Sequence, residues 1–241
     1  MPDARSTAAA SAYLTVALRH RIGSLHLDMQ FELARPWTIL FGPSGSGKTT
    51  ILRAIAGLVT PESGRIAVRQ ASMTTVLLDT AAHVDLPPHL RHTPLAPQSP
   101  SLFPHLTVQQ NLEYGGALDP TTNRVFGIGD LLSNRPAELS GGEAQRVSLA
   151  RAAAAANPRL LLLDEPFTGL DLPLRSELVS HLLEWQRRSR VPILSVTHDV
   201  AEAFQLGAQV IRLAEGRILA QGPALEVLRG ERERLLDQLN G

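Results

Sequence analysis

The chain of 241 residues contains no cysteine, only 4 % aromatic residues and no long apolar run. Without cysteine it cannot form disulfides, thiolate metal sites or a cysteine nucleophile. No apolar stretch approaches the 18 residues that a membrane-spanning helix needs, so we expect any membrane function to depend on another chain. Lysine plus arginine equal aspartate plus glutamate, 23 against 23. With no net positive charge, the chain has no overall electrostatic field that would attract nucleic acid.

The composition is otherwise that of a globular protein with a substantial core. Hydrophobic residues make up 44 % of the chain and charged residues 19 %, which suits a single domain over 1–241. Residues 1–12 lack the apolar centre of a secretory signal, and we expect them to form a loose tail. We also expect no additional regulatory domain after the core.

Strand and helix patterns alternate along most of the chain, which predicts a parallel α/β core. Period-two alternation at 13–18 and 25–31 predicts two antiparallel strands ahead of it. Buried strands are expected at 37–41, in RLLLLDEP (159–166) and in PILSVT (192–197), and further strands at 65–68, 74–79, 210–213 and 217–220. Helices are expected at 48–58, 142–156 and 201–206, and over the apolar positions Leu174, Leu178, Leu182 and Trp185. A small, partly helical insertion is expected at about 111–140 and a helical end at about 223–241.

A glycine-rich loop, GPSGSGKT, stands between the strand at 37–41 and the helix that follows it. Glycines let backbone N–H groups turn toward phosphates, and the helix N-terminus adds a partial positive charge. Lys48 is expected to neutralise terminal phosphate oxygens, and the Thr49 hydroxyl is expected to bind Mg²⁺. The residues expected to hold the nucleotide here are Gly42, Pro43, Ser44, Gly45, Ser46, Gly47, Lys48, Thr49 and Thr50.

An acidic pair ends the leucine-rich strand in RLLLLDEP. Ligands of such folds bind at the carboxyl edge of the sheet, where this strand delivers Asp164 and Glu165. Asp164 is expected to hold Mg²⁺ through its water shell, while Glu165 is placed to orient or deprotonate an attacking water. Together with the glycine loop, the pair predicts an ATPase.

A second potential anion cradle, LSGGEAQRV, opens the helix expected at 142–156. Here the sequence resembles the ATP-binding cassette family, because six short motifs follow one another in that family's order. They are GPSGSGKT, Gln98 in APQSPSLFPHLTV, LSGGE, LLLLDEP, TGLD at 168–171 and His198 in SVTHD. The resemblance implies a P-loop NTPase core with a mostly parallel sheet, an N-terminal antiparallel β-subdomain and a small helical subdomain.

The resemblance also implies a role for each matched position. Two copies pair head to tail, so that Ser140, Gly141 and Gly142 of one copy cap the γ-phosphate held by the glycine loop of the other. Gln98 is expected to reach Mg²⁺ and sense the nucleotide, and His198 is expected to contact the γ-phosphate and help to hold the water. Asp171 is expected to couple the two sites across the dimer.

The sequence departs from the family in four places, one of them Pro97, which precedes Gln98 where the family usually has an aromatic residue. No aromatic residue stands upstream of the glycine loop to stack on adenine, and His20 lies nearest the expected place, with Arg21 or Ile22 also able to pack there. Glu143 stands where glutamine is common. The insertion at 111–140 is short, so the helical subdomain should be reduced.

The function that the resemblance implies is the ATP-hydrolysing subunit of a membrane importer, peripheral at the cytoplasmic face of the membrane. The pattern is most similar to importers of molybdate or sulfate, with molybdate favoured. The expected partners are a transmembrane permease contacting Gln98–Asn111, a second copy of the chain and, indirectly, an external solute-binding protein, but no nucleic acid. A non-transport ATPase of the same family and a P-loop small-molecule kinase remain as alternatives.

Overall fold

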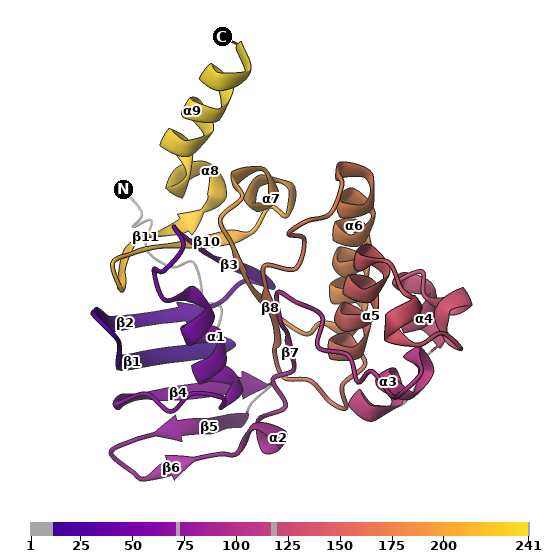
Figure 1. Ribbon diagram of the computed structural model, residues 1–241. Helices are drawn as coiled ribbons and strands as arrows, with labels where there is room; N and C mark the ends of the chain where they lie inside the picture. Colours follow the sequence, from indigo (N-terminus) through magenta and orange to yellow (C-terminus); the bar gives the residue numbers. More distant parts are fainter. Residues whose placement is uncertain (1–11, 71–72, 117–119, 241) are drawn as a thin grey trace, which may run out of the picture.

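Two β-sheets form the framework of the protein (Figure 1). The computed structural model describes residues 12–70, 73–116 and 120–240, so the tail expected at 1–12 lies outside the described residues except for Ala12. The first sheet has the strand order β2-β1-β4-β5-β6, with antiparallel neighbours throughout. Its strands are β1 (Leu14–Ile22), β2 (Leu25–Leu33), β4 (Ser63–Gln70), β5 (Met73–Asp79) and β6 (Val84–Asp85). The antiparallel pair predicted from period-two alternation is thus confirmed as β1 and β2.

The second sheet is mostly parallel, as the alternation of strands and helices predicted. Its order is β11-β10-β3-β9-β8-β7, and only the pair β10–β11 is antiparallel. The strands are β3 (Trp37–Phe41), β7 (Leu95–Ala96), β8 (Leu161–Asp164), β9 (Ile193–Thr197), β10 (Gln209–Ala214) and β11 (Arg217–Pro223). Strands β3, β8 and β9 are buried along their whole length, which explains why they read as continuous apolar runs.

Helix α1 (Lys48–Ala56) lies between the two sheets (Figure 1). Its Ile51 and Ile55 are fully buried in one core cluster with Val16 of β1 and Leu162 of β8. The helix begins after Gly47 (φ 96°) and ends before Gly57 (φ 80°), and both are left-handed conformations that favour glycine. The glycine loop is therefore held by a helix that both sheets fix in place.

A second core covers the other face of the parallel sheet. Leu112, Leu149, Leu178 and Leu182 pack there with Ile39 of β3. The helices on this side are α3 (Val108–Gly115), α4 (Pro120–Val125), α5 (Gly141–Ala153), α6 (Leu172–Ser189) and α7 (Val200–Gln205), with 3₁₀ turns at Gly129–Leu131 and Pro136–Glu138. The part expected at 111–140 thus consists of short helical pieces, and its residues 117–119 lie outside the described ones.

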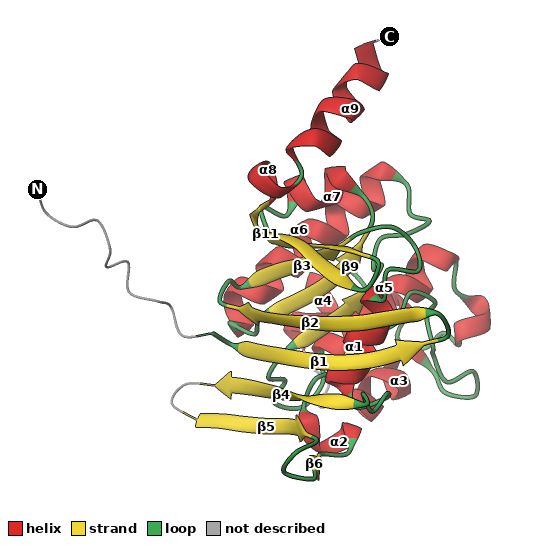
Figure 2. Ribbon diagram, turned by 90° about the vertical axis from the view of Figure 1, so that its left-hand side faces the viewer, coloured by secondary structure: helices red, strands yellow, loops and turns green. Residues whose placement is uncertain are grey.

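Three further helices complete the described chain. Helix α2 (Pro88–Arg91) precedes β7, and α8 (Ala224–Val227) leads into α9 (Arg229–Asn240), which extends away from the sheets (Figure 2). Within the described ranges, no helix combines the length and the apolar character that crossing a membrane requires.

Candidate functional site

The predicted site residues gather where three neighbouring parallel strands end. Phe41 at the end of β3 is in register with Thr197 of β9, and Asp164 at the end of β8 is in register with Val196 of β9. The segments that leave these strands carry the glycine loop, Glu165 and His198. Because parallel strands in register end at one edge of the sheet, residues far apart in the sequence meet there.

The glycine loop encloses the amino group of Lys48. This side chain is only 6 % exposed, and its Nζ donates hydrogen bonds to the carbonyl oxygens of Gly42 at 2.7 Å and Pro43 at 2.8 Å. Burial lowers the pKa of Lys48, while the nearby carboxylates of Glu165 and Asp164 oppose that shift. A cation thus lies over the loop where an anionic ligand would provide better partners than two neutral carbonyls.

Two glycines in the loop are required by close approach. A Cβ atom at Gly42 would collide with the carbonyl oxygen of Leu213, and one at Gly47 would collide with Leu27 Cδ2. At Gly45, by contrast, a Cβ would meet no atom within 4 Å, so the loop faces open space there. The loop is closely packed on the protein side and open on the side where a phosphate would sit.

Thr49 and Asp164 form the polar pair expected for a metal ion. The Thr49 hydroxyl donates to Asp164 Oδ1 at 3.0 Å. Burial raises the pKa of Asp164, and the hydrogen bond from Thr49 opposes that shift. Among the described residues no group of three or more acidic or histidine side chains could hold a metal. The pair fits Mg²⁺, which binds through one or two protein oxygens, water and substrate phosphates, better than a metal held by protein ligands alone.

Glu165 is the centre of the hydrogen bonds at this edge. Its Oε2 accepts from Gln98 Nε2 and from Thr168 Oγ1, each at 3.1 Å, and its Oε1 lies 3.3 Å from His198 Nδ1. Its backbone has φ 47°, a left-handed conformation that is unfavourable for a residue other than glycine. Three side chains from separate segments therefore orient one carboxylate.

Of those three side chains, sequence reasoning assigned no role to Thr168. Thr168 could have been found from the sequence, because it stands three residues after Glu165 and opens the TGLD stretch. The structure also pairs Gln98 with Glu165 rather than with Thr49 and Asp164. Gln98 thus contacts the group expected to handle water, and its role toward Mg²⁺ stays a prediction.

A cavity of about 690 Å³ joins these groups. Its lining includes Lys48, Thr49, Gln98, Glu165 and His198, and also Thr168, Ser44, Gly45, Gly47 and Thr50. Toward the antiparallel sheet the wall consists of Ile22, Ser24 and Leu25, with no aromatic side chain, as the sequence indicated.

His20, the residue predicted to contact adenine, lies behind this cavity, and that contact stays a prediction. His20 is absent from the lining and is paired with Leu27 inside the β1–β2 ladder. A strand rises about 3.3 Å per residue, so His20 stands roughly 7 Å behind Ile22, which does line the cavity. Ile22, one of the alternatives that the sequence left open, does line the cavity.

The second anion cradle lies outside this cavity. Ser140 caps α5, its Oγ accepting from the Glu143 N–H at 3.3 Å while Glu143 Oε2 accepts from the Ser140 N–H at 2.8 Å. Neither Ser140 nor Gly141 nor Gly142 lines the cavity. Glu143 therefore serves as the reciprocal partner of a capping box, which explains why glutamate suits this position, and the hydrogen bonds from Ser140 lower its pKa.

Two further residues connect the predicted motifs to neighbouring elements. Asp171 caps α6, its Oδ1 accepting from the Leu174 N–H at 2.9 Å. Gln145 of α5 is buried and donates through Nε2 to the carbonyl oxygen of Pro166 at 2.8 Å. Helix α5 is thus hydrogen-bonded to the turn that directly follows Glu165.

The loop after Gln98 is organised by a buried asparagine. Asn111 is fully buried; its Oδ1 accepts from the Phe103 N–H at 2.8 Å, and its Nδ2 donates to the carbonyl oxygens of Phe103, Leu106 and Thr107. Arg151 lies over the Phe103 ring at 5.5 Å and donates to Ser101 O at 2.7 Å. The loop is therefore a defined surface and not an irregular linker.

A cavity of about 620 Å³ lies beside this loop. Leu58, Phe103 and Tyr114 contribute apolar surface to its lining, and Arg151 contributes a cation. Tyr114 is 72 % exposed, which is unusual for a large aromatic side chain. The loop has four apolar residues. Val108 packs fully inward, whereas Leu102, Phe103 and Leu106 are half-buried.

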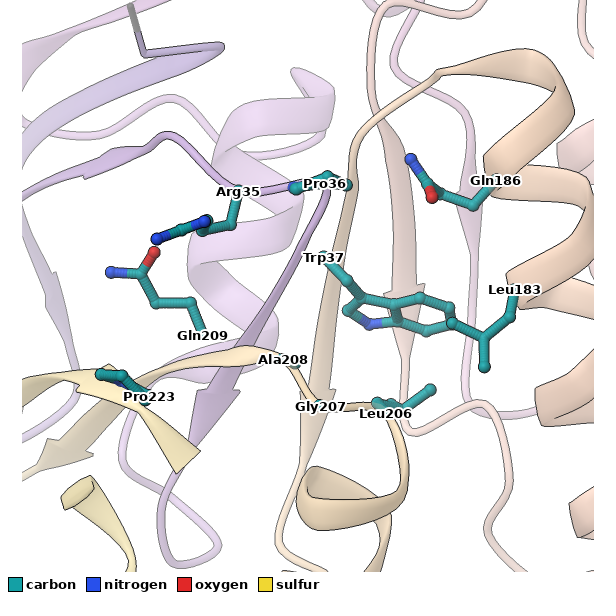
Figure 3. Close-up of a pocket in the computed structure, with 10 residues that line it drawn as sticks. All are labelled: Arg35, Pro36, Trp37, Leu183, Gln186, Leu206, Gly207, Ala208, Gln209 and Pro223. Atoms are coloured by element: carbon teal, nitrogen blue, oxygen red, sulfur yellow. The ribbon is translucent and has the colours of Figure 1, made fainter. Parts of the chain in front are cut away.

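A third cavity, of about 480 Å³, opens at the opposite edge of the parallel sheet (Figure 3). It lies near Trp37, whose indole N–H donates to Ser195 Oγ at 2.9 Å. Arg35 is the one ionisable side chain in its lining, which contains no carboxylate and no histidine. This cavity therefore lacks the carboxylate and the histidine that line the cavity beside the glycine loop.

Comparison with known proteins agrees with this geometry. Residues 27–168 match the family model described as ABC transporter. The chain is 41 % identical over 222 residues to the molybdenum import ATP-binding protein ModC of Mesorhizobium japonicum, with 88 % of this chain and 59 % of that protein covered. It is 40 % identical over 224 residues to the molybdate/tungstate import ATP-binding protein WtpC of Archaeoglobus fulgidus, with 89 % of each covered.

A solved structure gives the same result for the fold. The cbiO1 protein of Clostridium perfringens, described as part of the ABC transporter complex cbiONQ, superimposes with a TM-score of 0.75 and 26 % identity over 95 % of this chain and 94 % of that one. The chain spans 59 % to 62 % of the length of the first ModC relatives that it matches.

Proposed function

Because this chain belongs to the ABC transporter family, we propose that it hydrolyses ATP to ADP and phosphate in order to drive the import of molybdate or a similar oxyanion. The observation that carries the hydrolytic part is the position of Glu165. Its carboxylate is held by Gln98, Thr168 and His198 at the mouth of a cavity whose floor is the glycine loop with Lys48. A positioned carboxylate beside a phosphate cradle is what hydrolysis requires.

Each residue of the cavity then has a separate task. The glycine loop and Lys48 bind the phosphates, with Lys48 leaving its two carbonyl partners for phosphate oxygens. Thr49 and Asp164 would hold Mg²⁺, which neutralises the phosphate oxygens when bound. Glu165 accepts a proton from the attacking water, and His198, whose Nδ1 is 3.3 Å from Glu165 Oε1, fixes the carboxylate in place.

We further propose that the complete site requires a second copy of the chain. Ser140 and the N–H groups that follow it stand at the start of α5 and are absent from the cavity of their own chain. A helix N-terminus binds anions well. The N-terminus of α5 contacts no part of its own cavity, so we propose that it binds the γ-phosphate held by a partner copy. In a two-fold dimer one repeated surface would then build both sites.

The permease is proposed to bind at the apolar cavity beside the loop after Gln98. Exposed Tyr114, half-buried Phe103 and Leu58 form a patch there, and apolar patches of this kind mark interaction sites. The loop continues from Gln98, which contacts Glu165, so a partner docked there could influence hydrolysis directly. We therefore propose that the chain acts at the cytoplasmic face of the membrane, with the external solute-binding protein a partner only through the permease.

Hydrolysis is tested by measuring phosphate release from ATP without any acceptor. Glu165→Gln should retain ATP binding and lose roughly 10²- to 10⁴-fold in kcat, the usual contribution of a positioned base. The amide oxygen can still accept from Gln98 or Thr168, so folding should be preserved. Glu177→Gln, an exposed change on α6, is the matched control and should behave as the parent. Parent activity in Glu165→Gln, or activity that depends on a small-molecule acceptor, would refute the proposal.

The transported solute is tested in vesicles that contain the permease and this chain. ATP hydrolysis should rise when molybdate and its binding protein are added, with sulfate giving a smaller response. The isolated chain should not bind molybdate, because recognition belongs to the other components. A response to a sugar, peptide or metal ion instead would reject the oxyanion and leave the ATPase proposal intact. Failure to co-purify with any permease would favour a non-transport role.

A further inference from the structure

A partly buried polar network lies next to the site and contains groups that the proposed reaction does not use. It connects the start of α6 with the segment that carries His198 between β9 and α7. Its members are Arg175 of α6, Thr197 and Asp199 on either side of His198, and Glu202 of α7. Thr197 and Glu202 are each 3 % exposed, so water cannot easily replace the bonds between them.

Hydrogen bonds fix the backbone on both sides of His198. The Asp199 N–H donates to Thr197 Oγ1 at 3.0 Å, and the Thr197 hydroxyl donates to Glu202 Oε2 at 2.7 Å. Asp199 Oδ1 accepts from the Glu202 N–H at 3.1 Å and so caps α7. The turn at His198 is therefore internally rigid, but these bonds alone do not determine its distance from Glu165.

Arg175 supplies the connection to the rest of the site. Its Nη1 donates to Asp199 Oδ2 at 2.6 Å, and its backbone N–H donates to the carbonyl oxygen of Asp171 at 2.9 Å. Asp171 ends the turn in which Thr168 donates to Glu165. The two segments that contact Glu165 from opposite sides, through Thr168 and His198, are thus held together by one guanidinium.

We propose that Arg175 is a positioning residue for hydrolysis, which sets the place of His198 relative to Glu165 by clamping Asp199 to the start of α6. The inference rests on the proposed ATPase function for its kinetic consequences only. A purely stabilising role explains the geometry less well, because the side chain of Asp199 is 38 % exposed and ion pairs that reach the surface contribute little to stability. The ion pair instead specifies one arrangement of the segment that carries Thr168 and the segment that carries His198.

Several polar atoms of the clamp lack hydrogen-bond partners in the described part of the chain, so its hydrogen bonds can change when Glu202 ionises. Arg175 Nε and Nη2 and Glu202 Oε1 are buried without hydrogen-bond partners among the described residues, and Nη2 lies 3.9 Å from Glu202 Oε2. The groups that face Glu202 are Thr197, Arg175, Asp199 and Glu165. Burial raises the pKa of Glu202 to about 7, so this carboxyl changes charge in the working pH range. Its ionisation adds a second anion that competes with Asp199 for the guanidinium.

The kinetic test compares Arg175→Met with Arg188→Met, an exposed ion-pair change farther along the same helix. Arg175→Met should lower kcat by about tenfold or more and leave the KM for ATP within about twofold, since Lys48 and the glycine loop are untouched. Arg188→Met should match the parent. In a His198→Ala background, Arg175→Met should change kcat by less than about twofold, because the residue acts through His198. An equal loss in both backgrounds, or no loss in either, would overturn the proposal.

Two further measurements separate positioning from folding and from the proposed function. Asp199→Asn keeps the α7 cap and removes the ion pair, so it should lower kcat as Arg175→Met does even if the latter fails to fold. Arg175→Lys, which keeps the charge, should restore part of the loss. The imidazole NMR signal of His198 should shift in Arg175→Met and stay unchanged in Arg188→Met. This last result needs no hydrolysis, so an inactive parent rejects the ATPase proposal while an unmoved signal rejects the clamp.

Discussion

Replacing Arg91 should destabilise the protein more than any surface charge change. This arginine is 1 % exposed, and its guanidinium closes the carboxyl end of α1. Nη1 donates to the carbonyl oxygens of Ala54 at 2.7 Å and Ile55 at 3.0 Å, Nε donates to Leu86 O at 2.6 Å, and Nη2 donates to Asp85 Oδ1 at 2.6 Å. A cation at a helix C-terminus also interacts favourably with the helix dipole.

The size of the stability loss depends on which of these acceptors keep a hydrogen-bond partner in Arg91→Met. Asp85 is half exposed and can turn to water, and Ala54 O still accepts from the Gly57 N–H. Ile55 O retains only a long bond of 3.5 Å from Thr93 Oγ1. One or two buried carbonyls are left poorly satisfied at about 1–3 kcal/mol each, and the gain from no longer burying a charge offsets part of that. The net loss should be about 2–5 kcal/mol, against a total of about 5–15 kcal/mol for a typical domain.

Urea unfolding followed by tryptophan fluorescence and circular dichroism measures this loss. The control is Arg65→Met, which removes an exposed ion pair with Asp79 and should cost less than about 1 kcal/mol. If Arg91→Met costs less than about 1 kcal/mol, or no more than Arg65→Met, the buried carbonyls do not need the guanidinium and the reasoning is wrong.

Three other predictions concern the site and its surroundings. Ser140→Arg should abolish hydrolysis while the isolated chain retains its ATP affinity by equilibrium binding; a loss of affinity would assign Ser140 to its own chain's pocket. GTP should compete with ATP within about tenfold, because Ile22 replaces an aromatic stack worth about 0.5–1.5 kcal/mol, and a preference beyond a hundredfold would indicate a base-reading residue. Glu202 has its folded-state pKa raised from 4.5 to about 7, so the native state binds the extra proton and stability should fall by on the order of 3 kcal/mol as pH rises through that window. Glu202→Gln should remove this slope from the urea midpoints at pH 5–8, and an unchanged slope would assign it to other groups.

Strands and helices with strong local patterns were predicted well from the sequence. Of the four apolar positions predicted for one helix, Leu178, Leu182 and Trp185 are buried on α6 and Leu174 is half-buried, because helical periodicity is a property of neighbouring residues. The two-residue strands β6 and β7 and the short helix α2 were missed. All three elements lie in a stretch that is rich in proline and histidine. There β6 and β7 form because they pair with β5 and β8, and not because of local preference.

The candidate site divides in the same way. By itself the sequence located the glycine loop, the Asp164–Glu165 pair and the helix start at Ser140, since each depends on a strand end or a helix start a few residues away, whereas the capping of α6 by Asp171 was seen only in the structure. Only the tertiary structure decided that Ile22 and not His20 lines the cavity, that Thr168 and Gln98 share one carboxylate oxygen, that Arg91 is buried, and that Arg175 lies partly buried in a polar cluster. Those placements depend on strand register and on contacts between residues tens of positions apart. Local periodicity, which sequence reasoning uses, carries no information about such distances.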